Sequence, residues 1–410
     1  MSGTDGRVVI VGAGHAGGTA AAFLRQFGWT GEIVLIGDEP LIPYHRPPLS
    51  KAWLKGEADE ESLALRPADF YGEQALALRL NEQVARIDTA AHAVILSHGE
   101  RVAYDRLILA TGARARPLAV PGVGLQNVFS LRSAADAEGI KRALGIGRRI
   151  AIIGGGYIGL EVAASARALG AEVTVIEREA RLLARVASEP LSRFFEAYHR
   201  ARGVRFELGA QVAALDGTGA VEAVHLSDGR ALACDAALIG VGALPNEELA
   251  REAGLTCENG VVVDEAARTS DPHIYAIGDM SCRPIALYGR RHRLESVPNA
   301  IEQARQAASD LCGKPAPAPE VPWFWSDQYD LKLQIAGLAF DVDRLVLRGD
   351  LDEARFAVFH LDARNHVQAV EAVNAPAEFM AGRQLIQQRK QVAPEKLRDM
   401  SVSMKAVAAG

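Results

Sequence analysis

The feature that most constrains the fold is a glycine pattern that occurs twice, each time directly after a short apolar run. The first copy follows the apolar run "RVVIV" at Arg7–Val11, and an Ala-rich segment and a second apolar run, "EIVLIGD", come after it. The same order returns from Arg149 in "RIAIIGGGYIGLEVAASARALGAEVTVIE". A strand, a glycine turn, a helix and a second strand within about thirty residues form a βαβ unit. The sequence therefore predicts two βαβ units, and with them parallel sheets.

Each copy has its glycines in the spacing GxGxxG, and each glycine has a physical task. Gly12 allows a tight turn, Gly14 lets the backbone approach a pyrophosphate, and Gly17 lets the helix pack closely on the strand. The pyrophosphate then lies at the helix N-terminus, where free N–H groups and the helix dipole favour an anion. The second copy repeats the spacing with Gly154, Gly156 and Gly159. Two copies predict two dinucleotide sites in one chain.

An acidic residue at the end of the second strand of such a unit accepts hydrogen bonds from ribose hydroxyls. In the first copy the position reads "GDE", so Asp38 is the candidate, slightly displaced from the usual place. In the second copy Glu177 ends the strand "VTVIE", and its carboxylate would repel a 2′-phosphate. This favours NADH over NADPH. Arg178 and Arg181 could contact a phosphate, but we expect them to lie on a solvated face.

The rest of the chain reads as further strands, one long helix and a separate C-terminal segment. Hairpin-like stretches follow each βαβ unit, and an Ala/Gln-rich helix is expected near Asn299–Leu311. Gly313–Pro322, "GKPAPAPEVP", is predicted to be a stiff Pro-rich linker. Beyond it, "RLVLRGDLDEARFAVFHLDARNHVQAVEAVN" alternates as an antiparallel sheet does, and the tail is helical.

Composition excludes several classes of protein. The 410-residue chain has a net charge of −6 and no long basic tract, which argues against a nucleic-acid binder. The four cysteines, Cys234, Cys257, Cys282 and Cys312, form no closely spaced pair, so a disulfide framework or a metal site is not expected. The start "MSGTDGR" lacks the features of a signal peptide, and no apolar window is long enough for a membrane span. We expect a cytoplasmic protein.

The motifs together resemble the FAD-dependent pyridine-nucleotide reductases, and the resemblance covers nearly the whole chain. It rests on "VVIVGAGHAG", "LILATGA", "IIGGGYIGLE", "IGVGALPN" and "IYAIGD". More narrowly, "RPPLSK", "ESVPNAIEQAR" and "PWFWSDQYD" are similar to the putidaredoxin-reductase-like NADH:ferredoxin reductases that serve bacterial cytochromes P450 and ring-hydroxylating dioxygenases. The fold class implied is α/β, with two Rossmann-like dinucleotide-binding domains, for FAD and NADH, plus a smaller C-terminal α+β domain.

The resemblance also implies domain boundaries and cofactor contacts. It places an FAD-binding domain at residues 1–113 and 245–321, an NADH-binding domain at 114–244 and a C-terminal domain at 322–410. Besides the fingerprint glycines, the FAD contacts carried over are Ala16, Asp38, Arg46, Lys51, Val84, Thr111, Gly112, Arg132, Gly278, Asp279 and Val297. The contacts implied for the nicotinamide nucleotide are Gly156, Tyr157, Ile158, Glu161, Glu177 and Gly242.

By the same resemblance, three residues carry the chemistry. Lys51 is placed near the flavin N5 atom and paired with Glu161, so that a fixed cation stabilises the negative charge that arrives with a hydride. Without the resemblance, Lys51 would read as a surface lysine at a helix start, and Glu161 as a residue that complements a helix dipole. Trp325 resembles a tryptophan at the flavin edge; Trp323 and Phe324 are expected to be core residues.

The resemblance implies a one-electron [2Fe-2S] ferredoxin as the acceptor. No cysteine precedes Cys234, so a thiol pair beside the flavin, as in the thiol-dependent reductases, is not expected. An acidic ferredoxin needs a basic landing site, and the candidates are Arg66, Arg290, Arg291, Arg293, Arg305 and Lys332. Rubredoxin is an alternative acceptor, and an apoptosis-inducing-factor-like redox or binding protein is an alternative class. Quinone reduction at a membrane would need an amphipathic surface helix, and the tail is a poor one.

Overall fold

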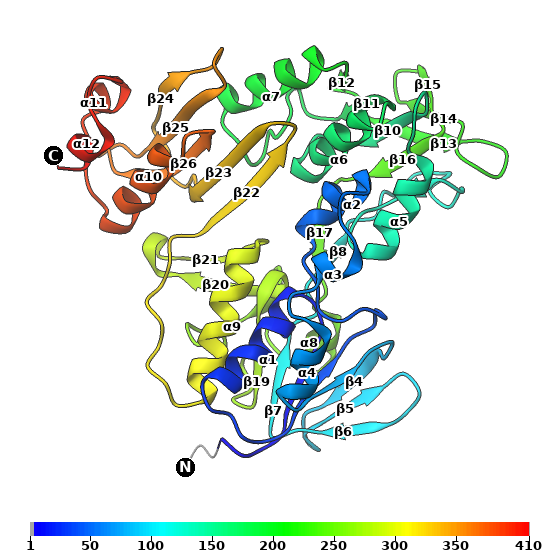
Figure 1. The fold of residues 1–410 in the computed structure, drawn as a ribbon, viewed down its shortest axis with the longest axis vertical. Helices are drawn as coiled ribbons and strands as arrows, with labels where there is room; N and C mark the ends of the chain where they lie inside the picture. Colours follow the sequence, from blue (N-terminus) through cyan, green and yellow to red (C-terminus); the bar gives the residue numbers. More distant parts are fainter. Residues whose placement is uncertain (1–3, 410) are drawn as a thin grey trace. The chain divides into compact units, whose positions relative to one another are not determined.

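In the computed structural model, which describes residues 4–409, the chain divides into two units (Figure 1). Unit 1 combines Met1–His45, Glu60–Arg114 and Leu244–Pro322, and unit 2 combines Arg46–Asp59, Ala115–Ala243 and Trp323–Gly410. Residues 1–3, at the start of the N-terminus expected to lack a signal peptide, and Gly410 lie outside the described residues. The three-domain boundaries expected from the sequence stay a prediction.

Unit 1 is built on a five-stranded parallel sheet in the order β19-β7-β1-β2-β3. Its strands are β1 (Val8–Val11), β2 (Ile33–Ile36), β3 (Leu76–Arg79), β7 (Arg106–Leu109) and β19 (Ile274–Ala276). All of β1 and β2 is buried, which explains why both are apolar at every position rather than alternating. The helices α1 (His15–Gln26) and α9 (Val297–Leu311) pack together and form one hydrophobic core with the sheet.

A second core of unit 1 includes residues of the antiparallel strands β4 (Val84–Asp88), β5 (Ala93–Leu96) and β6 (Arg101–Ala103). Shorter elements complete the unit. They are α3 (Glu60–Leu63), α4 (Ala68–Glu73), α8 (Glu248–Glu252), β18 (Val261–Val262), η2 (Gly278–Met280), β20 (Ser281–Ile285), η3 (Ala286–Tyr288) and β21 (Arg290–Arg293). Two of the points at which the chain passes from one unit to the other lie in β8 (Ala113–Ala115) and β17 (Ala243–Pro245).

Unit 2 repeats the parallel arrangement in the order β12-β11-β10-β16-β9. Its strands are β9 (Val128–Phe129), β10 (Arg149–Ile153), β11 (Glu172–Glu177), β12 (Arg205–Leu208) and β16 (Ala236–Ile239). The helices are η1 (Pro47–Ser50), α2 (Ala52–Lys55), α5 (Ala134–Ala143), α6 (Tyr157–Ala168) and α7 (Glu189–Ala201). An antiparallel ribbon of β13 (Val212–Asp216), β14 (Ala223–Leu226) and β15 (Ala231–Ala233) shares a core with the sheet.

The C-terminal part of unit 2 is an antiparallel sheet in the order β22-β23-β26-β25-β24. The strands are β22 (Trp323–Gln328), β23 (Leu331–Gly337), β24 (Arg344–Asp350), β25 (Arg355–Leu361) and β26 (Val367–Val373). The helices α10 (Pro376–Gln388), α11 (Pro394–Arg398) and α12 (Met404–Ala409) follow. Strand β22 also packs on α6, so the last part of the chain reaches the second βαβ unit.

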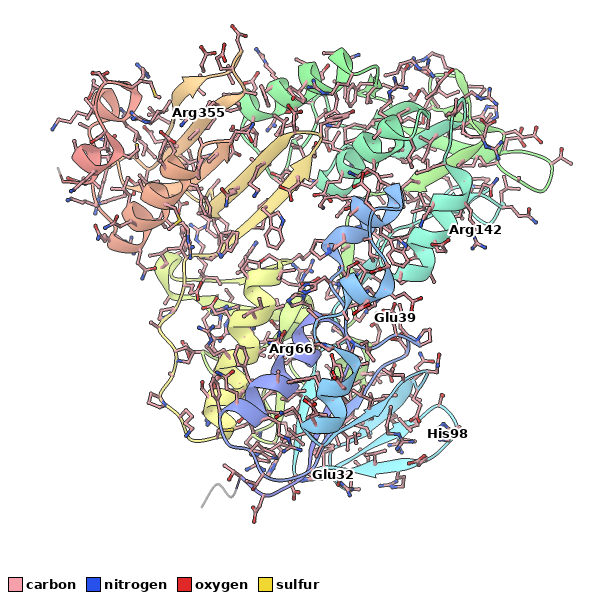
Figure 2. All side chains as sticks on the ribbon, viewed as in Figure 1. Glu32, Glu39, Arg66, His98, Arg142 and Arg355 are labelled. Atoms are coloured by element: carbon pink, nitrogen blue, oxygen red, sulfur yellow. The ribbon has the colours of Figure 1, made fainter. Side chains whose placement is uncertain are left out.

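These elements confirm the two predicted βαβ units, the antiparallel C-terminal sheet and the helical tail. The helix expected near Asn299–Leu311 begins two residues earlier, where Ser296 caps it. The ionisable side chains of His98, Arg142 and Arg355 are exposed on the outside of the units (Figure 2). Within residues 4–409, no helix has the length and apolar character that crossing a bilayer requires.

Candidate functional site: two nucleotide-binding turns and a lysine–glutamate pair

In unit 1, four predicted contact segments meet at the carboxyl ends of neighbouring parallel strands. Gly12 follows β1, Asp38 follows β2, Thr111 follows β7, and Gly278 follows β19. The chain leaves β1 for β2 on one side, and β7 lies on the other side of β1. Ligands of open α/β sheets bind at such a switch point, outside the carboxyl ends of the strands.

The first glycine turn has a backbone that only glycine fits. Gly12 has a φ of +111°, and a Cβ there would lie 2.2 Å from the carbonyl oxygen of Ala110. A Cβ on Gly17 would lie 1.9 Å from the carbonyl oxygen of Gly12. Gly278, with a φ of +76°, packs against Ala16, because a Cβ there would lie 3.0 Å from the Ala16 Cβ. This contact brings the "GD" segment with Asp279 to the first turn of α1.

The second turn repeats this geometry in unit 2. Gly154 has a φ of +110°, and a Cβ there would lie 2.3 Å from the carbonyl oxygen of Gly240. A Cβ on Gly159 would also lie 2.3 Å from an oxygen, that of Gly154, so α6 and β10 pack closely. A Cβ on Gly156 would meet no described atom within 4 Å. Gly154 and Gly159 are therefore needed for the fold itself, whereas Gly156 faces open space.

The helices that follow the two turns fit a bound anion. Both α1 and α6 begin at a glycine, lack a side-chain cap within the described chain, and have no acidic residue in the first turn. The helices α5, α7 and α9 instead begin at Ser133, Ser188 and Ser296, each of which accepts a hydrogen bond from a backbone N–H. The free N–H groups of α1 and α6 would bind the pyrophosphates of FAD and of a nicotinamide nucleotide.

The two ribose-binding candidates differ in their surroundings. Asp38 is exposed two residues beyond β2, while its neighbour Glu39 accepts a hydrogen bond from the Tyr44 hydroxyl at 2.6 Å. The Glu177 carboxylate accepts hydrogen bonds from the backbone N–H groups of Gly155, at 2.7 Å, and Glu179, at 2.9 Å. Glu177 is therefore fixed against the glycine turn, with its carboxylate in place to meet a ribose there.

The arginines near the second turn have different positions. Arg178 pairs with Glu179 at 3.2 Å and is exposed, and Arg181 donates to the carbonyls of Ala184 and Ala187. Both contacts agree with a structural role. Around the predicted contact Gly242, the exposed side chains of Arg116 and Arg185 would lie 3.8 and 3.9 Å from an added Cβ. Sequence reasoning missed these two, because neither belongs to a motif.

The centre of the site in unit 2 is an ion pair between Lys51 and Glu161, with 2.5 Å between Lys51 Nζ and Glu161 Oε2. The short helix η1 begins with Pro47 and Pro48, whose rings fix the backbone φ angles. Lys51 is its C-cap residue. Glu161 lies on the buried face of α6, where only 4% of its side chain is exposed. The helix α2 that follows Lys51 packs on α6, which brings the two charges together.

Two serines complete the environment of this carboxylate. The hydroxyl of Ser50 donates to Glu161 Oε2 at 2.5 Å, and the hydroxyl of Ser326, on β22, donates to Oε1 at 2.6 Å. Ser165 supports the arrangement by donating to the Ser50 carbonyl at 2.7 Å. Sequence reasoning missed Ser50 and Ser326 as site residues, although both lie in motifs that were singled out. A buried serine has no sequence signature of its own.

The aromatic residues of β22 alternate between the two faces of the strand. Trp325 packs on Trp323, with ring centroids 5.6 Å apart, while Phe324 packs on Tyr157 at 5.0 Å. Since successive strand residues face opposite sides, Trp325 points away from the face that carries Ser326 to Glu161. The structure thus brings the predicted Lys51 and Glu161 together and does not bring Trp325 to them.

The other predicted contacts have these places. Arg46 donates to the carbonyl of Arg132 at 2.6 Å, so these two residues are neighbours in unit 2. The Thr111 hydroxyl donates to the Asn246 carbonyl at 2.7 Å. The remaining ones are Val84, buried in a core; Gly112, beside Thr111 with a φ of +66°; Ile158, exposed at the start of α6; and Val297, at the start of α9.

The basic candidates for a landing site differ in exposure and in their contacts. Arg66, Arg290 and Lys332 are exposed. Arg291 is also exposed and donates to the Val263 carbonyl at 2.6 Å, whereas Arg293 pairs with Glu295 at 2.5 Å. The Arg305 guanidinium lies over the Phe23 ring, 5.4 Å from the ring centroid.

The thiols lack the properties of redox groups. All four cysteines are free, and burial raises the pKa of each thiol, that of Cys234 to about 11. Since the thiolate is the reactive form, none is activated for exchange with a disulfide. In the part of the chain that the structure describes, no group of three or more His, Cys, Asp or Glu side chains could hold a metal ion.

Several proteins share this chain's sequence and fold. It is 52% identical over 405 residues to a probable ferredoxin reductase of Castellaniella defragrans, with 98% of each chain covered. It is 47% identical to putidaredoxin reductase of Pseudomonas putida, over 98% of this chain and 96% of that one. A rubredoxin-NAD(+) reductase of Pseudomonas putida is 42% identical over 370 residues, 90% of this chain and 96% of the relative.

Among solved structures, the reductase in a covalent putidaredoxin reductase–putidaredoxin complex matches with a TM-score of 0.96 and 46% identity over 98% of both chains. The pyridine nucleotide-disulphide oxidoreductase model matches residues 6–304, and the reductase C-terminal model matches residues 323–408. Members of this family use FAD and NAD(H), which agrees with the two uncapped glycine turns. The chain therefore belongs to the pyridine nucleotide-disulphide oxidoreductase family, in the group with a reductase C-terminal domain.

Proposed function

We propose that this chain is an FAD-dependent ferredoxin–NAD(+) reductase, which takes a hydride from NADH and passes electrons singly to a [2Fe-2S] ferredoxin that supplies a cytochrome P450 or a dioxygenase. The observation that carries the proposal is the match along 98% of both chains to a putidaredoxin reductase solved with putidaredoxin. The relatives named as ferredoxin reductases support the same acceptor.

The chain's own residues would bind and orient the two cofactors. The first turn, with Gly12, Gly14 and Gly17, would hold FAD, and the second, with Gly154, Gly156 and Gly159, would hold NADH. Bound FAD supplies the hydride acceptor and can release electrons one at a time. Lys51 would hold a fixed positive charge for the negative charge that arrives with the hydride, and Glu161 would keep the ammonium in place.

The output to a one-electron acceptor is supported by the state of the thiols. A reductase of disulfides needs a dithiol that accepts electrons, and the four cysteines here are buried or half-buried with raised pKa values. Where such an enzyme has its cysteines, this chain has Pro47, Pro48 and Lys51. Four free cysteines also suit the cytoplasmic location that we include in the proposal.

A panel of acceptors tests this proposal. Purified FAD-bound protein is supplied with NADH and with [2Fe-2S] ferredoxins, with cytochrome c as the reporter, and a rubredoxin is assayed in parallel. We expect kcat/KM for at least one ferredoxin to exceed that for rubredoxin by tenfold or more. The second candidate function is rubredoxin reductase, which is supported by the 42% identity to a rubredoxin-NAD(+) reductase. A preference for rubredoxin in this assay would favour it. Reduction of neither protein would contradict both.

A further inference from the structure

The Lys51–Glu161 pair continues into a buried chain of hydrogen bonds that the C-terminal sheet supplies. Ser326 Oγ lies 2.6 Å from Glu161 Oε1, and Gln328 Nε2 lies 3.2 Å from Ser326 Oγ. Gln328 Oε1 in turn lies 2.8 Å from Nε2 of His199, on α7. Ser326, Gln328 and His199 are each at most 1% exposed. All of these residues belong to unit 2.

The direction of the hydrogens along this chain follows from the chemistry of each group. An ionised Glu161 only accepts, so the Ser326 hydroxyl donates to it and can accept only from Gln328. The Gln328 amide nitrogen therefore faces Ser326, and its carbonyl oxygen faces His199. His199 must then carry its hydrogen on Nε2. Burial lowers the pKa of His199 to about 4, which keeps this ring neutral near pH 7. Every hydrogen in the chain thus points toward the Glu161 carboxylate.

A buried carboxylate needs all of these donors. Glu161 Oε2 accepts hydrogen bonds from Lys51 and Ser50, while Oε1 accepts one from Ser326. A carboxylate that loses a donor in a buried place becomes free to rotate toward the remaining ones. Since Oε2 holds the Lys51 ammonium, any rotation of the carboxylate moves the ammonium as well.

The spacing of the two residues on β22 suits this task. Ser326 and Gln328 are two positions apart, so both face the same side of the strand, and their partners across the ladder, Leu333 and Leu331, are buried. The register of the C-terminal sheet therefore determines whether a hydroxyl reaches Glu161.

We propose that Ser326, backed by Gln328 and His199, is a positioning residue that fixes the Glu161 carboxylate and through it the Lys51 ammonium. The C-terminal segment then contributes to the hydride-transfer step through this hydroxyl, a role that no motif in the sequence assigns. The part of the proposal that concerns hydride transfer rests on the proposed function; the part that concerns Lys51 does not.

The test compares Ser326→Ala with a matched control, Ser192→Ala. Ser192 is as buried as Ser326, and its hydroxyl donates one hydrogen bond, to the Leu182 carbonyl, which the substitution removes. Ser192 does not belong to the series of hydrogen bonds that reaches Glu161. Two quantities are measured on FAD-bound protein. One is the rate of acetylation of Lys51 by an amine-reactive ester, followed by peptide mass spectrometry with the exposed Lys314 as internal reference. The other is the rate of flavin reduction by NADH in stopped flow.

We expect Ser326→Ala to raise Lys51 acetylation about threefold or more and to slow flavin reduction about tenfold, with Ser192→Ala close to wild type in both. Ser326→Thr, which keeps the hydroxyl, restores both rates toward wild type. Lys51 acetylation in Ser326→Ala that equals that of wild type and Ser192→Ala would overturn the proposal. If Ser326→Ala does not fold, Gln328→Met serves instead, with the same direction expected and the same equality overturning it.

Failure of the proposed function gives a different pattern. If NADH does not reduce the flavin of the wild-type protein, the proposed function fails, while a rise in Lys51 acetylation in Ser326→Ala still supports the positioning of Lys51. If wild type reduces a ferredoxin but Ser326→Ala matches wild type in both rates, the positioning proposal alone is wrong.

Discussion

At the scale of single residues, Lys51 is the side chain on which the proposed chemistry most depends. Its side chain is 20% exposed and its ammonium is held by Glu161, so Lys51 carries a fixed charge and is not a mobile surface lysine. Lys51→Ala should slow flavin reduction by NADH about tenfold or more, because the charge that favours the reduced state is lost. FAD retention, measured by absorbance after gel filtration, should change little.

The matched control for this substitution is Lys55→Ala, four residues further on. Lys55, the last residue of α2, pairs at 2.6 Å with Glu57, whose side chain is more exposed than that of Glu161. Its removal should leave the rate of flavin reduction unchanged. Equal rates in wild type, Lys51→Ala and Lys55→Ala would contradict the role of Lys51.

His199 predicts a pH dependence of stability. Its pKa is lowered by burial from 6.5 to about 4, so below pH 6.5 the unfolded chain binds a proton that the folded chain does not. The contribution of His199 to the free energy of unfolding is fully present above about pH 6.5 and is lost as the pH falls toward 4. Between pH 7.5 and pH 5 the loss should be about 2 kcal/mol.

Urea unfolding at these two pH values measures this effect. His199→Gln, which keeps a donor for Gln328, should reduce the difference between the two midpoints. His225→Gln, at a histidine whose side chain is 41% exposed, should preserve the wild-type difference. If both variants show the wild-type pH dependence, His199 does not titrate as described.

Glu177 predicts the choice of nucleotide. Its carboxylate is fixed by the N–H groups of Gly155 and Glu179, where it would meet a ribose. Glu177→Ala should lower the ratio of kcat/KM for NADH to that for NADPH by tenfold or more, because both the hydrogen bonds and the repulsion of a 2′-phosphate are removed. Steady-state reduction of an artificial acceptor with each nucleotide measures the ratio. An unchanged ratio would assign the preference to other residues.

Residues differ in how far the sequence predicted them. Gly12 and Gly154 were predictable because the motif spacing encodes a positive φ and a close backbone approach, and the structure shows both. Ser326 was not predictable as a partner of Glu161, since 165 positions separate them and the contact depends on how β22 packs on α6. The pairing of Lys51 with Glu161 came from a family resemblance, not from spacing.

At the scale of elements, the turn between β10 and α6 separates a folding role from a binding role. Gly154→Ala would place a Cβ 2.3 Å from the Gly240 oxygen at a φ of +110°. It should destabilise unit 2 by about 3 kcal/mol or more. Gly156→Ala meets no atom within 4 Å and has an ordinary φ of −83°, so the fold should persist. The added methyl group would fill the space in which the pyrophosphate would come close to the backbone.

Thermal unfolding and NAD+ binding measured on both variants test this separation. We expect Gly156→Ala to keep the wild-type melting temperature and to weaken NAD+ binding about tenfold or more. Wild-type affinity in Gly156→Ala would show that the nucleotide does not approach this glycine.

The sequence predicted the position of an element best where the element is a buried parallel strand, because such a strand is apolar at nearly every position. The strands β1 and β10 were read directly from "RVVIV" and "RIAII". The faces of β22 were less clear from the sequence, because three aromatic residues in a row hide the alternation. The structure shows Trp323 with Trp325 on one side and Phe324 with Tyr157 on the other.

At the scale of the whole molecule, the net charge of −6 means that an acidic ferredoxin must find a local basic surface. If Arg66, Arg290, Arg291 or Lys332 supply it, kcat/KM for ferredoxin should fall several-fold between about 50 and 300 mM salt, because screening weakens steering. The rate with a small neutral quinone should change little over the same range. A flat response with ferredoxin would argue against a basic landing site.

The most direct measurement of the central claim is anaerobic stopped flow with NADH, the FAD-bound protein and an oxidised [2Fe-2S] ferredoxin. The flavin absorbance should bleach first, and two equivalents of ferredoxin should then be reduced for each NADH consumed. A flavin that NADH does not bleach, or that bleaches and passes no electrons to any ferredoxin of the panel, would contradict the account.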